Sequence, residues 1–271
     1  MTVASTLPSD IRGSGTDSAA VGAPLLRLDN VSRHFGTLKA VSDVSFAMKA
    51  GELRAVIGPN GAGKTTFFNL ISGLLPPTTG KVWFGGQDIT REAVVKRVGR
   101  GIVRTFQITE IFPELTVFEN IRIGIETGAG LNPRPFVSRP ARIALDRRIN
   151  ELIERVDLGD KANRVVGELA HGDQRVVEVT MALSLKPRLL LLDEPTAGMG
   201  DTETEHMVEL VRRLHAEQAV SILFIEHDMS IVFGIAQHIT VLDQGRKLAE
   251  GTPDQISSDP KVRAAYLGET E

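Results

Sequence analysis

The eight residues from Gly58 to Thr65 constrain the fold of this chain more than any other stretch. Their sequence, GPNGAGKT, matches the phosphate-binding pattern G-x-x-x-x-G-K-[ST] at every fixed position. Leu53 to Ile57, just before it, is typical of a short buried strand, and Lys64 to Leu74 is expected to form a helix. A strand, a glycine-rich loop and a helix in this order direct backbone N–H groups and a helix N-terminus at phosphate oxygens. The sequence therefore predicts a nucleoside triphosphate site.

Two side chains of this loop have distinct expected tasks. The Lys64 ammonium would reach the β- and γ-phosphates, and the Thr65 hydroxyl would coordinate Mg²⁺. The alternative is a glycine-rich turn with a stray lysine, which the agreement of motif and context disfavours. The expected nucleotide contacts are Gly58, Pro59, Asn60, Gly61, Ala62, Gly63, Lys64, Thr65 and Thr66.

Composition limits the other classes of function. A chain of 271 residues with 42% apolar residues can fold as one large α/β domain. The net charge of −3 argues against a nucleic-acid binder that works through a broad basic field, and the lack of cysteine excludes disulfides and thiolate metal sites. No run approaches the ~18 apolar residues that cross a bilayer. We see no signal-peptide pattern at the N-terminus.

The order of the segments predicts the architecture. Residues 1–24 are rich in small and polar residues and are expected to form a disordered tail. Two alternating segments, 26–31 and 41–48, are typical of an antiparallel hairpin. We predict an α/β fold with a P-loop (RecA-like) parallel-sheet core and an antiparallel β subdomain at the N-terminus. Residues 25–271 would form one domain, with a helical subdomain inserted at about 108–185.

Polar residues that follow apolar strands are candidates for the chemistry. Asp193 follows the buried strand expected at 188–192 and is placed to hold Mg²⁺ through water. Glu194 could orient the attacking water or accept its proton. Gln107 and His227 each end another candidate strand, so Gln107 could touch Mg²⁺ or the water and His227 could align the γ-phosphate with Glu194. Taken alone, a histidine at a strand end is more often structural.

These motifs follow the order and spacing of ATP-binding-cassette (ABC) ATPases, which the chain resembles from about residue 25 to its C-terminus. Four further segments resemble the ATPase subunits of branched-chain amino acid importers. They are RHFG at 33–36, DEPTAGM at 193–199, IEHDM at 225–229 and YLGE at 266–269. Urea and short-amide importers use similar ATPases, so the resemblance leaves the solute open.

The resemblance implies further roles, cofactors and partners. Phe35 would stack on adenine, a core phenylalanine being the alternative. Gln107 would sense the γ-phosphate and relay to the membrane partner, and His227 would be the switch histidine. ATP and Mg²⁺ are the implied cofactors. The implied partners are a second ABC ATPase subunit, two transmembrane permease subunits and, indirectly, a solute-binding protein, with no nucleic acid. The permease would hold the chain on the cytoplasmic face of the cell membrane.

The family signature LSGGQ is altered in this chain, where residues 169–173 read LAHGD. Ala170 replaces the serine that would contact the γ-phosphate of the opposing subunit. His171 replaces a glycine, and Asp173 replaces the glutamine and brings an acid near a triphosphate. Gly172 and the N-terminus of the helix that we expect from Asp173 to Leu185 keep backbone N–H donors available.

The loop after the catalytic acid departs from the family as well, with Gly200 where an aspartate is usual and Asp201 one position late. We therefore expect the chain to pair with a different, related ATPase, rather than with a second copy, and the two sites to be unequal. Residues 108–120 carry apolar side chains, among them Phe112, and would form part of the groove for a cytoplasmic helix of the permease. The alternative is that these side chains are core.

Three other classes are less compatible with the sequence. ABC ATPases of DNA repair or translation carry duplicated cassettes, long coiled coils or basic insertions, which are absent here. Another phosphate-loop enzyme, such as a small GTPase or a kinase, is the second class, and a GTPase should carry the guanine motif N-K-x-D, which this chain lacks. A module that binds ATP without turnover would not need Lys64, Asp193, Glu194 and His227 together, although the altered signature keeps this alternative open.

Overall fold

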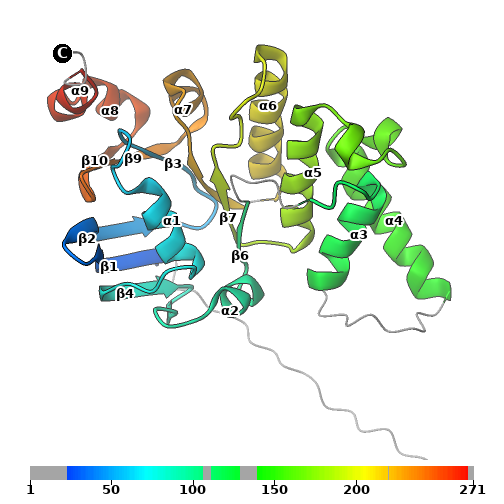
Figure 1. Cartoon of the computed structure of the whole chain (residues 1–271), viewed down its shortest axis with the longest axis horizontal. Coiled ribbons are helices and arrows are strands. Elements are labelled where there is room, and N and C mark those ends of the chain that lie inside the picture. Colours follow the sequence, from blue (N-terminus) through cyan, green and yellow to red (C-terminus); the bar gives the residue numbers. More distant parts are fainter. Residues whose placement is uncertain (1–22, 106–110, 129–138, 219, 268–271) are drawn as a thin grey trace, which may run out of the picture.

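The computed structural model describes residues 23–105, 111–128, 139–218 and 220–267 (Figure 1). Most of the expected tail of residues 1–24 lies outside the described residues. Gln107, with its expected roles, lies outside them as well. Within the described ranges, no helix is both long and apolar enough to span a membrane.

A six-stranded sheet forms the centre of the fold. Its order is β10-β9-β3-β8-β7-β6, and every neighbouring pair is parallel except β9 and β10. Every residue of β3, β7 and β8 is buried, which explains why these strands are mostly apolar, with Arg54, Asp193 and Ser221 as their buried polar residues. The strands are β3 (Leu53–Ile57), β6 (Ile102–Arg104), β7 (Leu189–Asp193), β8 (Ser221–Ile225), β9 (His238–Asp243) and β10 (Arg246–Gly251).

A four-stranded antiparallel sheet, of order β2-β1-β4-β5, confirms the expected N-terminal β subdomain. It lies at the lower left of Figure 1, beside α1 (Lys64–Ser72). Phe46 of this sheet meets Phe67 of α1 edge to face, with ring centroids 5.3 Å apart. The strands are β1 (Leu26–Phe35), β2 (Leu38–Met48), β4 (Thr79–Phe84) and β5 (Gln87–Asp88).

Alternate residues of β7 enter two different cores. Leu189 and Leu191 pack with α1 and the antiparallel sheet, whereas Leu190 and Leu192 pack with the helices on the other face. The period of two along a strand produces this division. The six-stranded sheet is thus covered on both faces, and its strand ends remain available for function.

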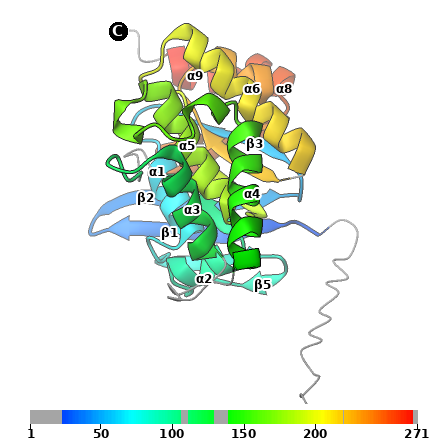
Figure 2. The ribbon, with the colours of Figure 1, turned by 90° about the vertical axis from the view of Figure 1, so that its right-hand side faces the viewer.

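Among the residues described between β6 and β7, three form α-helices: α3 (Val117–Gly128), α4 (Arg139–Arg155) and α5 (His171–Ser184). They form the end of the molecule opposite the antiparallel sheet (Figure 1), and α3 and α4 face the viewer in Figure 2. Two short 3₁₀ turns, η1 (Gly159–Lys161) and η2 (Val166–Glu168), connect α4 to α5. These helices are the inserted helical part that the sequence predicts.

Several helix ends differ from expectation. The helix α1 stops at Ser72 rather than Leu74, because Gly73 takes a left-handed conformation and donates its N–H to the Asn69 carbonyl. The helix α5 begins at His171 rather than Asp173. The last three residues of the signature, 171–173, are therefore in the first turn of this helix, and Ala170 is its N-cap.

The other helices are α2 (Val94–Gly99), α6 (Asp201–Gln218), α7 (Met229–Ile235), α8 (Pro253–Ser258) and α9 (Pro260–Leu267). The helices α2, α7 and α8 are too short to show a helical period in the sequence. Tertiary contacts and caps hold them instead. The Arg97 guanidinium of α2 donates to the Leu70 and Ile71 carbonyls of α1, and Thr252 forms a capping box with Gln255 in α8.

Candidate active site

The phosphate-binding loop curls between β3 and α1 as the motif predicts. Gly63 has a φ of 98°, and a Cβ atom there would lie 2.3 Å from the Ala40 carbonyl oxygen. Glycine is the residue that tolerates both this conformation and this close approach. The Lys64 side chain folds back over the loop, and its ammonium donates to the carbonyls of Gly58 at 2.5 Å and Pro59 at 3.0 Å.

The loop opens into a hollow of about 540 Å³. Its lining brings together many of the predicted site residues, among them the catalytic candidates Glu194 and His227. Residues of β2 and of the β9–β10 turn also line it, which the sequence did not suggest. The lining residues are Leu38, Lys39, Ala40, Asn60, Gly61, Ala62, Gly63, Lys64, Thr65, Thr66, Glu194, His227 and Gln244.

Glu194 and His227 meet across the ends of β7 and β8. The strands are parallel neighbours with Asp193 opposite Ile225, so the residues that follow each strand lie side by side. Nε2 of His227 is 2.8 Å from Oε1 of Glu194. Glu194 has a φ of 48°, which is unusual for a residue with a side chain and is typical of backbone strain at functional sites.

Asp193 is buried behind these two residues and is bound by an arginine that the sequence reasoning missed. Nη2 of Arg104 lies 2.6 Å from Oδ2 of Asp193, and the two side chains are 5% and 1% exposed. Nη1 of the same guanidinium is 2.5 Å from Oδ1 of Asn69, on α1. The available signal was a charged residue at the end of the short apolar strand β6, since such a residue needs a partner when it is buried.

Arg175 is a second buried arginine that the sequence reasoning missed. It comes from α5 and donates to the carbonyl oxygens of Asp193 at 2.7 Å and Glu194 at 3.2 Å. Its other nitrogen pairs with Glu178 at 2.6 Å. The signature helix is thereby tied to the backbone of the acidic strand end.

The signature does not lie at the chain's own phosphate loop. Ala170, Gly172 and Asp173 line a separate hollow of about 390 Å³ between the α4–α5 connection and α6. Lys161 of η1 contacts both carboxylate oxygens of Asp173, at 2.8 and 2.9 Å. Glu203 of α6 accepts the Gly172 N–H at 3.3 Å. The signature is thus set apart from the chain's own phosphate loop, and the Gly172 N–H that we expected to be available to a phosphate is bonded to Glu203.

Other predicted residues lie at the surface. Phe35 is 43% exposed with the Arg33 guanidinium 4.6 Å from its ring centroid, so the alternative that it is a core residue is wrong. Phe112 is 46% exposed, whereas Ile111 and Phe118 are partly buried against the core. The expectation that residues 108–120 present apolar groups thus holds for Phe112 among those described.

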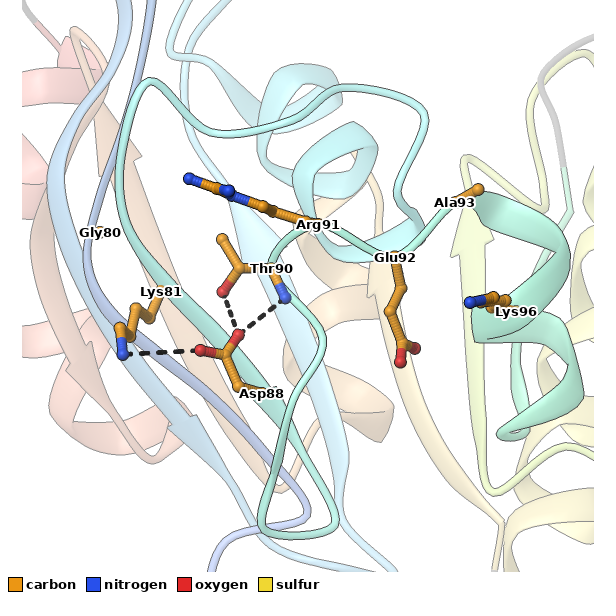
Figure 3. A pocket seen from close by; sticks show the side chains of 8 residues that line it. All are labelled: Gly80, Lys81, Asp88, Thr90, Arg91, Glu92, Ala93 and Lys96. Carbon is orange, nitrogen blue, oxygen red and sulfur yellow. Dashed lines mark hydrogen bonds and ion pairs between the residues drawn. The ribbon is translucent and has the colours of Figure 1, made fainter.

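A hollow of about 650 Å³ lies away from this site, on the antiparallel sheet and α2 (Figure 3). Its carboxylates are already engaged within the protein. Asp88 accepts hydrogen bonds from Thr90, which lower its pKa, and lies 3.6 Å from Lys81. The side chain of Glu92 pairs with Arg100. This hollow is larger than the phosphate-loop hollow, but none of the predicted site residues lines it.

A phosphate loop facing an acidic strand end and a histidine defines a nucleoside triphosphatase of the P-loop class. Residues 41–197 match the family model described as ABC transporter, and the chain belongs to this family of ATPases. Residues 246–271 match a second model, described as branched-chain amino acid ATP-binding cassette transporter.

Two relatives carry the name high-affinity branched-chain amino acid transport ATP-binding protein. BraF of Pseudomonas aeruginosa is 40% identical and LivG of Escherichia coli is 41% identical, each over 91% of this chain and 98% of the relative. The ADP conformation of MJ1267, an ATP-binding cassette of an ABC transporter, superposes with a TM-score of 0.80 at 33% identity. It covers 90% of this chain and 99% of that one.

Proposed function

We propose that this chain hydrolyses ATP to power the import of branched-chain amino acids. The observation that carries the proposal is the end-to-end similarity to BraF and LivG, together with the match of residues 246–271 to a model of the same name. The position proposed is the cytoplasmic face of the cell membrane, where the permease would hold the chain.

Glu194 is the proposed catalytic base. Its carboxylate borders the phosphate-loop hollow and would orient the attacking water. It would accept a proton from that water as the water oxygen bonds to the γ-phosphorus and the bond to the ADP oxygen breaks. His227, hydrogen-bonded to Glu194, would hold this carboxylate in line and contact the γ-phosphate. Lys64 and the loop amides would offset the charge that develops on the phosphate oxygens, and ADP and phosphate would be the products.

Mg²⁺ is proposed as the companion of ATP, and the residues present fit it. Oδ1 of Asp193 is buried and has no hydrogen-bond partner among the described residues, and Thr65 lines the adjacent hollow. A carboxylate oxygen and a hydroxyl are the donors that Mg²⁺ accepts. When bound, the ion would offset the negative charge of the β- and γ-phosphates. Gln107, the third proposed ligand, lies outside the described residues.

Two subunits would enclose the nucleotides, each phosphate loop facing the signature of the other. The separation of the signature from the phosphate loop within one chain supports this arrangement. A post-hydrolysis dimer of MJ0796 bound to ADP and phosphate has the same fold, with a TM-score of 0.70 at 25% identity over 84% of this chain and 98% of that one. The altered signature favours a different, related ATPase as the second subunit.

Coupling to two permease subunits is proposed through the segment after β6. Exposed Phe112, close to the start of α3, supports a groove for a cytoplasmic helix of the permease. Gln107 would report the state of the γ-phosphate to this groove. A solute-binding protein would act on the far side of the membrane, without touching this chain.

Uptake of labelled leucine, urea and short amides, in cells with and without the gene, tests the proposal. We expect leucine uptake to fall without the gene, and the wild type but not Glu194→Gln to restore it. A response of urea or amide uptake alone would correct the solute and keep the ATPase. Normal uptake of all three would contradict import of these solutes and leave the ATPase itself standing.

A further inference from the structure

We propose that Arg104 is a positioning residue of the metal site, which holds one oxygen of Asp193 so that the other faces the cation. The proposal rests on the proposed use of Mg²⁺ with ATP. Its basis is the pair of contacts that the guanidinium makes, to Oδ2 of Asp193 at 2.6 Å and to Asn69 at 2.5 Å.

The pair leaves the two carboxylate oxygens of Asp193 unequal. Oδ2 accepts a charge-assisted hydrogen bond from Arg104, whereas Oδ1 has no partner among the described residues and is buried. A buried carboxylate oxygen without a partner is costly. A water bound to the metal would supply the hydrogen-bond donor that Oδ1 of Asp193 lacks.

Arg104 also relates Asp193 to the phosphate loop. Asn69 belongs to α1, the helix that begins with Lys64 and Thr65, and Phe68 of the same helix lies 5.6 Å from the guanidinium carbon. Arg104 therefore bridges the helix that carries one proposed metal ligand and the strand end that carries the other. Replacing a residue that orients a metal ligand in this way typically weakens metal affinity by about 10- to 100-fold.

Two effects of removing Arg104 have opposite signs, which makes the proposal testable. Loss of orientation would weaken the metal site. Loss of a positive charge close to Asp193 would, by itself, make the site more attractive to a cation. We expect the loss of orientation to be the larger effect, so that the metal site weakens.

The test measures the affinity of the full-length chain for ATP by calorimetry, in excess Mg²⁺ and in EDTA. A Glu194→Gln background prevents hydrolysis during the titration. We expect Mg²⁺ to tighten ATP binding, and Arg104→Met to lose about tenfold of that Mg²⁺-dependent gain while affinity in EDTA is unchanged. Arg104→Lys should recover part of the gain, because an ammonium can hold Oδ2 but cannot also bridge to Asn69 in the same fork geometry.

Arg97→Met is the matched control. Arg97 is another buried arginine, 1% exposed, whose burial lowers its pKa to about 10 and whose guanidinium donates to the backbone carbonyls of Leu70 and Ile89. This variant should lower the melting temperature and keep the Mg²⁺-dependent gain. A purely structural Arg104 would behave in the same way.

A Mg²⁺-dependent gain in Arg104→Met that equals or exceeds that of the background would overturn the proposal. If Arg104→Met does not fold, as judged by circular dichroism, the gain in Arg104→Lys decides by the same criterion. A background protein without any Mg²⁺-dependent gain would instead contradict the proposed Mg²⁺ site itself, and with it the role of Arg104.

Discussion

Nζ of Lys161 lies 2.8 Å from one carboxylate oxygen of Asp173 and 2.9 Å from the other. The acid that replaces the glutamine of the family signature is therefore paired, and it does not direct an uncompensated charge at a triphosphate. Because Lys161 ends η1, a turn outside the signature, the sequence motif alone does not reveal this compensation.

The first prediction concerns this pair. Lys161→Gln should weaken the use of ATP at the site that the signature completes by about fivefold, roughly the 1 kcal/mol of a partly exposed ion pair. The double variant Lys161→Gln with Asp173→Gln should restore it, because the unpaired acid is then gone. The measurement is the KM for ATP of the assembled transporter. A double variant as weak as Lys161→Gln alone would contradict charge compensation.

Ala170→Ser should raise hydrolysis in the assembled transporter. The added hydroxyl would supply the γ-phosphate donor that the signature lacks, and a preorganised donor of this kind contributes about 2 kcal/mol or more to catalysis. Phosphate release at saturating ATP measures the effect, and ATP binding by the isolated chain serves as the control. No gain, or a loss, would mean that the altered signature is not the cause of unequal sites.

Glu194→Gln should lower hydrolysis by at least about 10²-fold, because the amide cannot accept a proton from the attacking water. ATP binding should persist, since Lys64 and the loop amides are unchanged. His227→Ala should also lower hydrolysis, by removing the 2.8 Å contact that orients Glu194. Single-turnover phosphate release, compared with binding by calorimetry, separates the two steps. Hydrolysis near wild type in Glu194→Gln would exclude it as the base.

Phe112→Ala tests the proposed permease groove. Phe112 is about half exposed, so its removal should change the folding stability of the isolated chain little. Solute uptake should fall while ATP binding stays normal, because the side chain would contact the permease and not the nucleotide. Phe118→Ala is the contrasting variant, since Phe118 packs against the core and its loss should lower the melting temperature. Full uptake by a stable Phe112→Ala protein would contradict the groove.

Asp228→Ala should destabilise the chain by about 1 kcal/mol, because Asp228 caps α7 by accepting hydrogen bonds from Ser230. Those bonds lower the pKa of Asp228, and the bond from the Ser230 hydroxyl contributes more than the bond from its N–H. The cap therefore stabilises the fold above the unfolded pKa and is lost as the pH falls through the folded pKa. Melting temperatures should differ at neutral pH and converge at acidic pH. A constant difference would contradict this cap.

Local patterns in the sequence were sufficient for the parts of this protein that depend on neighbours along the chain. The phosphate loop, its strand and its helix follow from glycine conformation and backbone N–H geometry within residues 53–72. The buried strands β7 and β8 follow from their apolar runs, and Glu194 and His227, which come after them, meet because the strands are parallel neighbours. These features predicted the P-loop class and many of the residues around the phosphate-loop hollow.

Tertiary structure alone decided where the buried and half-buried charges find partners. Arg104 and Asp193 are 89 residues apart in the chain, and Arg175 reaches the backbone of an acid 18 residues away. Such pairs carry no periodic signal, yet the cost of burying an unpaired charge makes each of them obligatory once the chain is folded. Tertiary structure also decided that α2, α7 and α8 form. These helices are too short to be stable alone, and contacts and caps in the surrounding fold hold them.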